Sequence, residues 1–376
     1  MQPAPGARTA TADLALVRRY PKLARLPRHA LTALPTPVRP LDRLARRRDL
    51  SGLWIKRDDV SGALYGGNKP RKLEWLLGAA RARGRRSVIT FGGIGTHHGL
   101  ATAIGARDAG MHSVLVLLPQ PVTAHVRHNL LLAYAVGAEL HLAASVAGVA
   151  AIALRLCGGA LLRGRPLAIV PAGGSSALGT IGYVNAALEL ADQVRAGAMP
   201  EPDAIFVPLG SGGTAAGLAL GCRLAGLRSR VVAVLVSDIL PPSLARLASL
   251  GRATLRRLQR AAPEIPPVVV RPDDLTIVRG YLGAAYGAVT EAGLAAQRVL
   301  AEEEGIVLET TYTAKCMAAL LDLASRPPYR GRPLLFWNTY SSVDLRATVG
   351  EPPDWHELPA AFHRFFVAEP PVPEVR

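Results

Sequence analysis

The chain has 376 residues, of which 49% are hydrophobic and 19% are charged, and this composition excludes an intrinsically disordered protein. The formal net charge of +16 raises nucleic acid and anionic membranes as partners. Because aromatic residues make up only 5% and the arginines are scattered along the chain, we expect neither a nucleic-acid partner nor a membrane partner.

Three cysteines, Cys157, Cys222 and Cys316, are widely spaced and form no C-x-x-C pair. This pattern argues against a disulfide framework or a zinc ribbon and fits a reducing compartment, so we expect a cytoplasmic protein. The first 30 residues contain no apolar segment typical of a signal peptide. The densest arginine run, 43–48, is expected to be a solvated loop or helix face, with contact to an acidic partner as the less favoured alternative.

Short apolar runs alternate with helix-length segments through most of the chain. Strands are expected at 53–57, 87–91, 113–118, 140–143, 167–171, 204–209, 231–237, 306–309 and 334–338. Helices are expected at 71–83, 96–109, 123–136, 178–196, 215–225, 291–304 and 314–324. Most strand candidates are rich in Val, Ile and Leu without strict alternation, as is typical of strands buried on both faces. The alternation predicts βαβ units.

This number of strands is too large for one compact sheet. We therefore predict an α/β fold with two open, twisted, mainly parallel sheets flanked by helices, and hence two lobes. The most apolar stretch, 142–154, is too short to span a bilayer and is predicted to be a buried helix. The ends, 1–40 and 351–376, are rich in proline and break the alternation, so they are expected to be accessory segments.

Three glycine-rich turns each follow a predicted strand and precede a predicted helix. They lie at 92–96, 173–176 and 210–214, and the last has the sequence Gly-Ser-Gly-Gly-Thr. A helix N-terminus with free N–H groups suits a phosphate or a carboxylate. The third turn lacks the spacing of dinucleotide and P-loop motifs, so a monophosphate is its best candidate ligand. The alternative is a tight turn that binds nothing.

Lysine is rare, since only five of the 44 Lys and Arg residues are lysines. Lys69 follows two glycines and precedes Pro70, which suits the first position of a helix. The positive end of the helix dipole lowers the pKa of an amine there, and a Schiff-base lysine needs a lowered pKa. A surface lysine is the commoner alternative. Together, such a lysine and a monophosphate turn suggest pyridoxal 5'-phosphate as cofactor.

Several separated motifs occur in one order along the chain. They are Lys56-Arg57-Asp58-Asp59, Gly66-Gly67-Asn68-Lys69 with Arg71-Lys72-Leu73-Glu74, Gly173-Gly174-Ser175 with Gly179 and Gly182-Tyr183, Gly210-Ser211-Gly212-Gly213-Thr214, Tyr286-Gly287 and Tyr312-Thr313. Over about 39–349 the chain resembles the D-cysteine desulfhydrase / 1-aminocyclopropane-1-carboxylate deaminase family. These are fold type II, tryptophan synthase beta-like enzymes that depend on pyridoxal phosphate.

The resemblance implies roles for individual residues. It puts the Schiff base with the cofactor on Lys69 and places Asn68, Lys72, His97 and Thr313 beside the cofactor. It implies that the phosphate rests on Gly210, Ser211, Gly212, Gly213 and Thr214. Tyr286 and Tyr312 are the implied substrate-facing acid/base or positioning residues, and Thr96 the implied donor to the substrate carboxylate. The resemblance also implies a homodimer, a large cofactor-binding domain formed by 1–70 and 179–376, and a small domain at 71–178.

Thr313 distinguishes between branches of the family, because the deaminases of the cyclopropane amino acid carry a glutamate at this position. A hydroxyl cannot hold a protonated pyridine as a carboxylate does, and a neutral ring is a weaker electron sink. The resemblance therefore implies α,β-elimination from a small amino acid, which yields a keto acid and ammonia. Once the incoming amino acid has displaced Lys69 from the cofactor, the lysine amine is the expected base for the α-proton.

Two departures from the family pattern leave the substrate open. His97 stands where an asparagine is usual, and His97 and His98 could instead form structural hydrogen bonds; adjacent histidines do not face each other, so we expect no metal site. Tyr340 replaces a glycine and could narrow the pocket. One alternative is therefore the same fold with β-replacement, racemase or other specialised chemistry. Another is a catalytically inactive basic binding protein.

Overall fold

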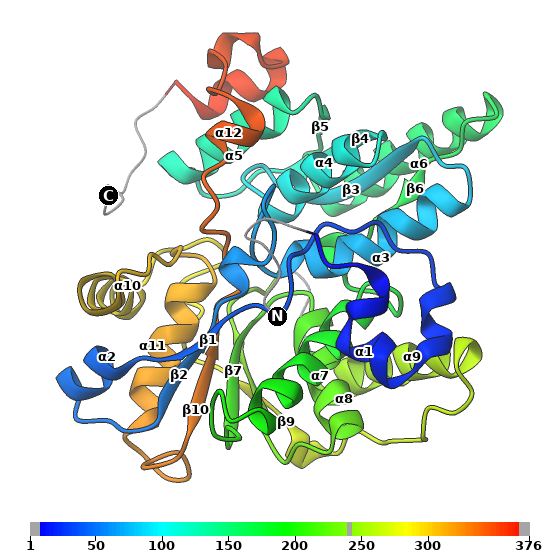
Figure 1. Ribbon diagram of the computed structural model, residues 1–376. Coiled ribbons are helices and arrows are strands. Elements are labelled where there is room, and N and C mark those ends of the chain that lie inside the picture. Colours follow the sequence, from blue (N-terminus) through cyan, green and yellow to red (C-terminus); the bar gives the residue numbers. More distant parts are fainter. Residues whose placement is uncertain (1–7, 239–242, 368–376) are drawn as a thin grey trace. The chain divides into compact units, whose positions relative to one another are not determined.

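The computed structural model describes residues 8–238 and 243–367 (Figure 1). The chain divides into two compact units, each with its own sheet. The first unit comprises Met1–Leu26, Ala30–Lys72 and Ser175–Val343, and the second comprises Pro27–His29, Leu73–Gly174 and Asp344–Arg376. The outermost parts of the two expected accessory segments, 1–7 and 368–376, lie outside the described residues.

The first unit is built on a six-stranded sheet with the order β1-β2-β10-β7-β8-β9. Its strands are β1 (Val38–Pro40), β2 (Leu53–Lys56), β7 (Ala204–Leu209), β8 (Arg230–Leu235), β9 (Leu275–Val278) and β10 (Leu334–Trp337). All neighbouring strands are parallel except β1 and β2, which run antiparallel. The alternation of apolar runs and helices in the sequence leads to this arrangement, because parallel neighbours require crossover connections.

Helices cover both faces of this sheet (Figure 1). One face packs against α2 (Asp42–Arg47), α10 (Glu291–Glu304) and α11 (Thr313–Ala324), and the other against α7 (Ile181–Arg195), α8 (Gly213–Ala225) and α9 (Leu244–Ala261). Successive strand residues point to opposite faces, so Phe206 joins one core while Ile205 and Val207 join the other. Burial on both faces explains why the strands lack a polar face in the sequence.

The second unit contains a four-stranded parallel sheet with the order β5-β4-β3-β6. Its strands are β3 (Ser87–Gly93), β4 (His112–Leu118), β5 (Glu139–Leu142) and β6 (Ala168–Ile169). Its longer helices are α4 (His97–Asp108), α5 (Ala124–Ala135) and α6 (Val146–Leu162). Helix α3 (Asn68–Ala82) begins in the first unit and ends in the second. These findings confirm the predicted α/β fold with two mainly parallel sheets.

The predicted strand at 306–309 is wrong. Ile306 and Leu308 are buried in the core whereas Val307 is 56% exposed, so the alternation is genuine, but the segment pairs with no strand in the described part of the chain. Alternating burial reports which side chains face the core and not whether a neighbouring strand offers hydrogen bonds. The elements that had not been predicted include the strands β1 and β9 and the long helix α9.

The predicted buried helix at 142–154 is also wrong. Residue 142 ends β5, and α6 begins at Val146 and keeps most of its outer side exposed, with Leu154 at 77% and Leu162 at 91%. Its inner side, including Ile152 and Leu156, packs on the four-stranded sheet. Across residues 8–238 and 243–367, no helix combines the length and the apolar character needed to cross a membrane.

The arginine run at 43–48 lies on and just after α2, with Arg46, Arg47 and Arg48 exposed, as expected for a solvated helix face. Arg47 forms ion pairs with Glu302 and Glu303, near the end of α10. The cysteines Cys157, Cys222 and Cys316 are free thiols. Part of the C-terminal tail packs on α5, where Arg127 Nε donates a 2.8 Å hydrogen bond to the Phe365 carbonyl.

Candidate functional site

Three loops of the first unit meet at one edge of its sheet. Strands β2, β10 and β7 are parallel neighbours, so the segments that follow them leave the sheet at the same edge. These segments are the motif 56–59, the segment 338–341 and the glycine turn 210–214. In open α/β sheets, ligands bind outside the carboxyl ends of the strands. This edge is therefore where a small-molecule site is expected.

The Gly66-Gly67-Asn68-Lys69 segment is held between two of these loops. The Gly67 N–H donates to the Asp58 carbonyl at 2.7 Å, and the Asn68 N–H donates to the Thr339 carbonyl at 3.1 Å. Gly67 has φ +78°, and a Cβ there would lie 2.5 Å from the Thr339 oxygen. The backbones approach so closely that glycine is required, and this approach fixes where α3 and the Lys69 side chain begin.

A Gly67→Ala substitution is expected to lower the free energy of unfolding by more than about 2 kcal/mol, since it adds a backbone clash to the cost of a positive φ. Gly84→Ala is the matched control, because Gly84 has φ +67° with nothing within 4 Å of an added Cβ. The control substitution should lower the free energy of unfolding by only about 1 kcal/mol. Denaturant unfolding of both variants measures the difference, and equal losses would show that the close approach contributes nothing.

The glycine turn after β7 forms a cradle of hydrogen-bond donors. Gly212 has φ +92° and α8 begins at the next residue, with no side chain of Gly212 to cap it. The Gly213 N–H donates to Ser175 Oγ at 2.9 Å, and Ser175 Oγ lies 2.7 Å from Ser211 Oγ. Asn68 Nδ2 donates to Thr214 Oγ1 at 3.2 Å. The lysine segment and the third glycine turn, predicted separately, are therefore in direct contact.

Lys69 is partly buried beside this cradle. Its Nζ donates to Asn68 Oδ1 at 2.5 Å and lies 6.0 Å from the centre of the Tyr312 ring. Burial lowers the pKa of Lys69 to about 8, although the Glu309 carboxylate acts in the opposite direction. The lowered pKa agrees in direction with the expectation from the sequence, and burial is its main cause.

Lys72, one turn further along α3, is 2% exposed. Burial and the nearby Lys69 charge together hold the pKa of Lys72 well below its usual range. Two amines, the partly buried Lys69 and the buried Lys72, lie beside a cradle of N–H and hydroxyl groups, so the region is rich in hydrogen-bond donors. An anionic group such as a phosphate suits this donor set.

Two of the predicted tyrosines are paired. Tyr286 Oη and Tyr312 Oη are 2.6 Å apart, and their rings meet edge to face. Burial raises the pKa of each phenol. Two tyrosines outside any motif serve other contacts, since Tyr281 donates to Asp322 and Tyr329 packs edge-on against Phe206. The structure thus brings the two motif tyrosines together near Lys69.

Glu309 was missed in the sequence. Its carboxylate accepts hydrogen bonds from the backbone N–H groups of Thr311, Tyr312 and Thr313, at 2.6–2.8 Å. The Thr313 hydroxyl also lies 3.2 Å from Glu309 Oε1. The available signal was an acidic residue just before the predicted helix at 314–324, which is typical of a helix start.

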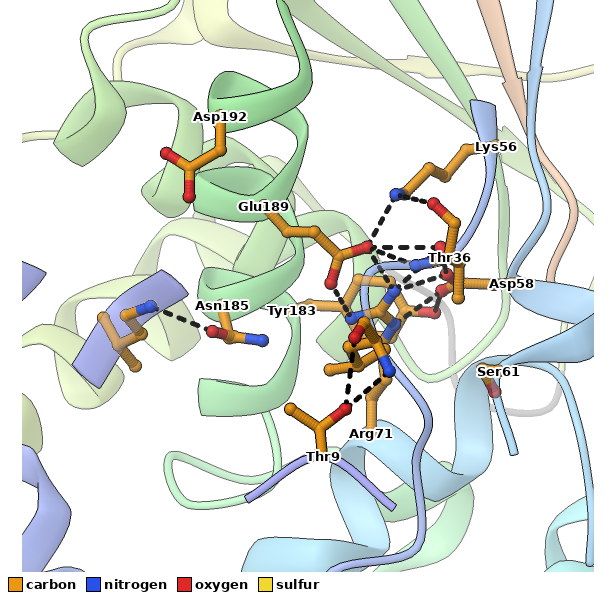
Figure 2. Close-up of polar contacts among 12 residues, drawn as sticks. Thr9, Thr36, Lys56, Asp58, Ser61, Arg71, Tyr183, Asn185, Glu189 and Asp192 are labelled. Atoms are coloured by element: carbon orange, nitrogen blue, oxygen red, sulfur yellow. Dashed lines mark hydrogen bonds and ion pairs between the residues drawn. The ribbon is translucent and has the colours of Figure 1, made fainter. Parts of the chain in front are cut away.

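A buried ionic network lies next to the start of α3 (Figure 2). The Arg71 guanidinium contacts Asp58 Oδ1 at 2.7 Å and Glu189 Oε2 at 3.0 Å, and Lys56 Nζ contacts Glu189 Oε1 at 2.6 Å. Asp58 Oδ2 also accepts hydrogen bonds from the Tyr183 hydroxyl and the Trp337 indole, both at 2.7 Å. The network therefore ties α3 to β2, α7 and β10.

The second unit carries the remaining predicted residues. Thr96 is the N-cap of α4, where its hydroxyl accepts from the Gly99 N–H at 3.2 Å. His97 Nε2 lies 2.8 Å from Nε2 of His125, a residue that the sequence had not singled out. Asn129 Nδ2 donates to the Gly95 carbonyl at 3.0 Å and also lies 3.3 Å from His125 Nε2. His125 Nε2 is thus within hydrogen-bond distance of both His97 and Asn129.

His98 has a different environment from His97. It is 5% exposed, and its Nε2 lies 3.0 Å from Thr90 Oγ1. Because the Thr90 hydroxyl donates to the Val170 carbonyl, His98 Nε2 is the donor in this pair. His98 therefore makes a structural hydrogen bond. Across the described ranges 8–238 and 243–367, no three His, Cys, Asp or Glu side chains are grouped to hold a metal ion.

Comparison with known proteins identifies the family. Residues 30–339 match the family model described as pyridoxal-phosphate dependent enzyme. D-cysteine desulfhydrase of Klebsiella pneumoniae (strain 342) is 34% identical over 86% of this chain and 97% of its own length. Nocardicin C-9' epimerase of Nocardia uniformis subsp. tsuyamanensis is 36% identical over 87% of this chain and 97% of its own length.

Solved structures agree. An ACC deaminase homologue superposes with a TM-score of 0.74 at 32% identity, over 85% of this chain and 93% of that chain. The processed form of threonine deaminase isoform 2 from Solanum lycopersicum shares the fold, with a TM-score of 0.55 at 16% identity over 92% of this chain and 90% of its own. With a family match across most of its length, this chain belongs to the pyridoxal-phosphate-dependent enzymes.

Proposed function

We propose that the first unit is the cofactor-binding domain and that Lys69 is the residue that holds pyridoxal phosphate. The donor set supports this assignment, because Lys69, Lys72 and the N-terminus of α8 are suited to an anion. A Cβ at Gly213 would lie 2.5 Å from Ser175 Oγ and would crowd the cradle. The phosphate is accordingly assigned to Gly210–Thr214, with Asn68 bridging the lysine and the turn.

The cofactor supplies an electron sink for charge that develops at the α-carbon of an amino acid. The protein supplies proton transfer and orientation. The pKa of Lys69, about 8, lies close to neutral pH, so its amine is suited to accept and return the α-proton. The paired Tyr286 and Tyr312 hydroxyls are suited to hand a proton to a leaving group, because both phenols stay protonated well above neutral pH.

The remaining predicted residues have supporting roles in this proposal. Thr96, at the N-terminus of α4, is assigned to the substrate carboxylate, which a helix N-terminus favours. His97 and Thr313 are assigned to the cofactor ring. We further propose the small domain at 71–178, which is supported by the grouping of Leu73–Gly174 in the second unit. From the family resemblance we also propose a homodimer, and from the few widely spaced cysteines a cytoplasmic location.

The reaction that we propose is α,β-elimination from a small amino acid to a keto acid and ammonia, as in a D-cysteine desulfhydrase. The observation that carries it is the 34% identity to proteins with that name over most of the chain. The phenol pair beside the lysine amine supports it, because elimination needs one group to accept the α-proton and another to protonate the leaving group.

Epimerisation is the second candidate. It is supported by the 36% identity to nocardicin C-9' epimerase. The same lysine and phenol pair would serve it, because inversion of a carbon centre uses one group to remove a proton and another to return it. Elimination and epimerisation differ in whether a β-substituent leaves.

A substrate screen in deuterated water distinguishes these reactions. Purified enzyme with pyridoxal phosphate is incubated with D- and L-amino acids that carry a β-leaving group and with matched amino acids that lack one. Elimination predicts ammonia and keto acid from the first group. Epimerisation predicts recovered amino acid with inverted configuration and deuterium at the α-carbon. If the screen yields neither product, both proposed reactions are wrong for small amino acids.

A further inference from the structure

Glu309 lies at the start of α11, and its carboxylate is committed to the backbone. The residue is 7% exposed. Its Oε2 accepts the Thr311 N–H at 2.8 Å, and its Oε1 accepts the Tyr312 N–H at 2.8 Å and the Thr313 N–H at 2.6 Å. The N-cap residue Tyr312 makes no side-chain cap of its own. The carboxylate of Glu309 therefore sets the conformation of the turn 311–313.

This turn carries two residues already assigned to the site. Tyr312 reaches the Tyr286 hydroxyl at 2.6 Å, and its ring centre lies 6.0 Å from Lys69 Nζ. The Thr313 hydroxyl accepts from the Glu309 N–H at 3.1 Å. Its own hydrogen is then directed to Glu309, whose Oε1 and carbonyl oxygen lie 3.2 and 3.3 Å away. One side chain thus orients both a phenol and a hydroxyl.

The charge of Glu309 also acts on its neighbours. It opposes the effect of burial on the pKa of Lys69 and adds to the rise in the pKa of Tyr286 and Tyr312. It likewise opposes the effect of burial on the pKa of Lys315, which lies in the first turn of α11. The titratable groups around the carboxylate and Lys69 include Tyr65, Lys72, Tyr286, Tyr312 and Lys315, together with Tyr340, which acts on Tyr65, and Asp238, which acts on Lys315.

We propose that Glu309 is a positioning residue of the active site, whose buried carboxylate fixes the Tyr312–Thr313 turn beside Lys69 and whose charge acts on the Lys69 amine. This inference rests on the proposed role of Lys69. Glu309 contacts neither substrate nor cofactor in this account; it acts through Lys69, Tyr312 and Thr313.

The test uses the pH dependence of cofactor capture by the full-length protein after its cofactor has been removed. Only a neutral amine adds to the aldehyde of pyridoxal phosphate, so the rate at which visible absorbance develops follows the pKa of Lys69. The variants are Glu309→Gln, which removes the charge with little change in shape, and Glu309→Asp, which keeps the charge. Glu309→Gln is expected to lower the pH midpoint by about one unit, the lower end of the range for a nearby opposite charge.

Glu304→Gln is the matched control. The Glu304 side chain is 4% exposed and also caps a helix, since Oε1 accepts the N–H groups of Arg43 and Leu44 at 3.1 Å, but its ion pair is with Arg39. The control should lose stability without a shift of the midpoint, and Glu309→Asp should keep the midpoint near that of the wild type.

The possible outcomes separate the inference from the proposed function. An unchanged midpoint in Glu309→Gln, with normal absorbance in the wild type, would overturn the role of Glu309 alone. Absence of visible absorbance in the wild type at every pH would instead overturn the proposed role of Lys69. A Glu309→Gln protein that does not fold leaves Glu309→Asp to decide, because a midpoint displaced by a full unit despite the retained charge contradicts the inference.

Discussion

Lys69→Ala is expected to remove the visible absorbance that pyridoxal phosphate acquires in the wild-type protein and to lower turnover about 10³-fold or more. Alanine offers no amine to the cofactor, and it also removes the group proposed to move the α-proton. The loss of absorbance is measured in a spectrum of the purified variant with added cofactor. Lys69→Arg should fail in the same way, because a guanidinium keeps its charge and cannot add to an aldehyde.

Lys22→Ala is the control for this prediction. Lys22 is an exposed lysine that pairs with Glu264 at 3.2 Å, outside every motif. The control should retain both the absorbance and the activity. If Lys69→Ala kept the absorbance and Lys72→Ala lost it, the cofactor would be held one helical turn away from the predicted residue.

Most of the fold could be predicted because parallel strands covered by helices appear in the sequence as short apolar runs that alternate with helix-length segments. Segment 204–209 was placed correctly from its apolar run, as was the helix at 291–304 from its length between two apolar runs. Helix α9 was missed although its buried residues Leu247, Leu255 and Leu258 have helical spacing and Ser243 caps it. Segment 306–309 shows the opposite error, since a local pattern cannot reveal whether a strand has a partner.

The site was predictable only where its signals are local. Lys69 and the turn 210–214 stand out through glycines and a neighbouring proline, and the structure brings them into contact. His125 lies 28 positions from His97, its hydrogen-bonding partner, and no spacing rule relates residues so far apart. Glu189 and Lys56 are 133 positions apart. Such pairs depend on the tertiary fold, and the sequence alone gave no reason to join them.

The buried network around Arg71 leads to the second large effect (Figure 2). Arg71→Met is expected to lower the free energy of unfolding at neutral pH by about 3–5 kcal/mol, the usual cost of removing one partner of a buried ion pair. The Arg71 side chain is 1% exposed and that of Asp58 is fully buried. Methionine has a similar length, so the loss reports the unpaired carboxylates of Asp58 and Glu189 rather than a cavity.

Arg18→Met is the matched control, because Arg18 pairs with Asp192 on the same helix as Glu189 but is 55% exposed. Arg18→Met should lower the free energy of unfolding by less than about 1 kcal/mol, as is usual for exposed ion pairs. Because Lys69 lies in the first turn of α3, two residues before Arg71, the Arg71→Met protein should also bind pyridoxal phosphate more weakly. Denaturant unfolding compares the two variants, and similar losses would mean that the network stabilises the fold no more than a surface pair.

The pH dependence of the Arg71→Met loss identifies its origin. The Arg71 and Lys56 charges lower the pKa of Glu189 to about 2 despite burial, which by itself raises it. A carboxylate whose pKa is lower in the folded than in the unfolded state stabilises the protein above its ordinary pKa, and this contribution disappears as the pH falls toward the folded-state value. The difference in the free energy of unfolding between wild type and Arg71→Met should therefore be largest above about pH 5 and should decrease toward pH 2. A gap that stays constant across this range would assign the loss to packing, because methionine changes the shape of the site equally at every pH.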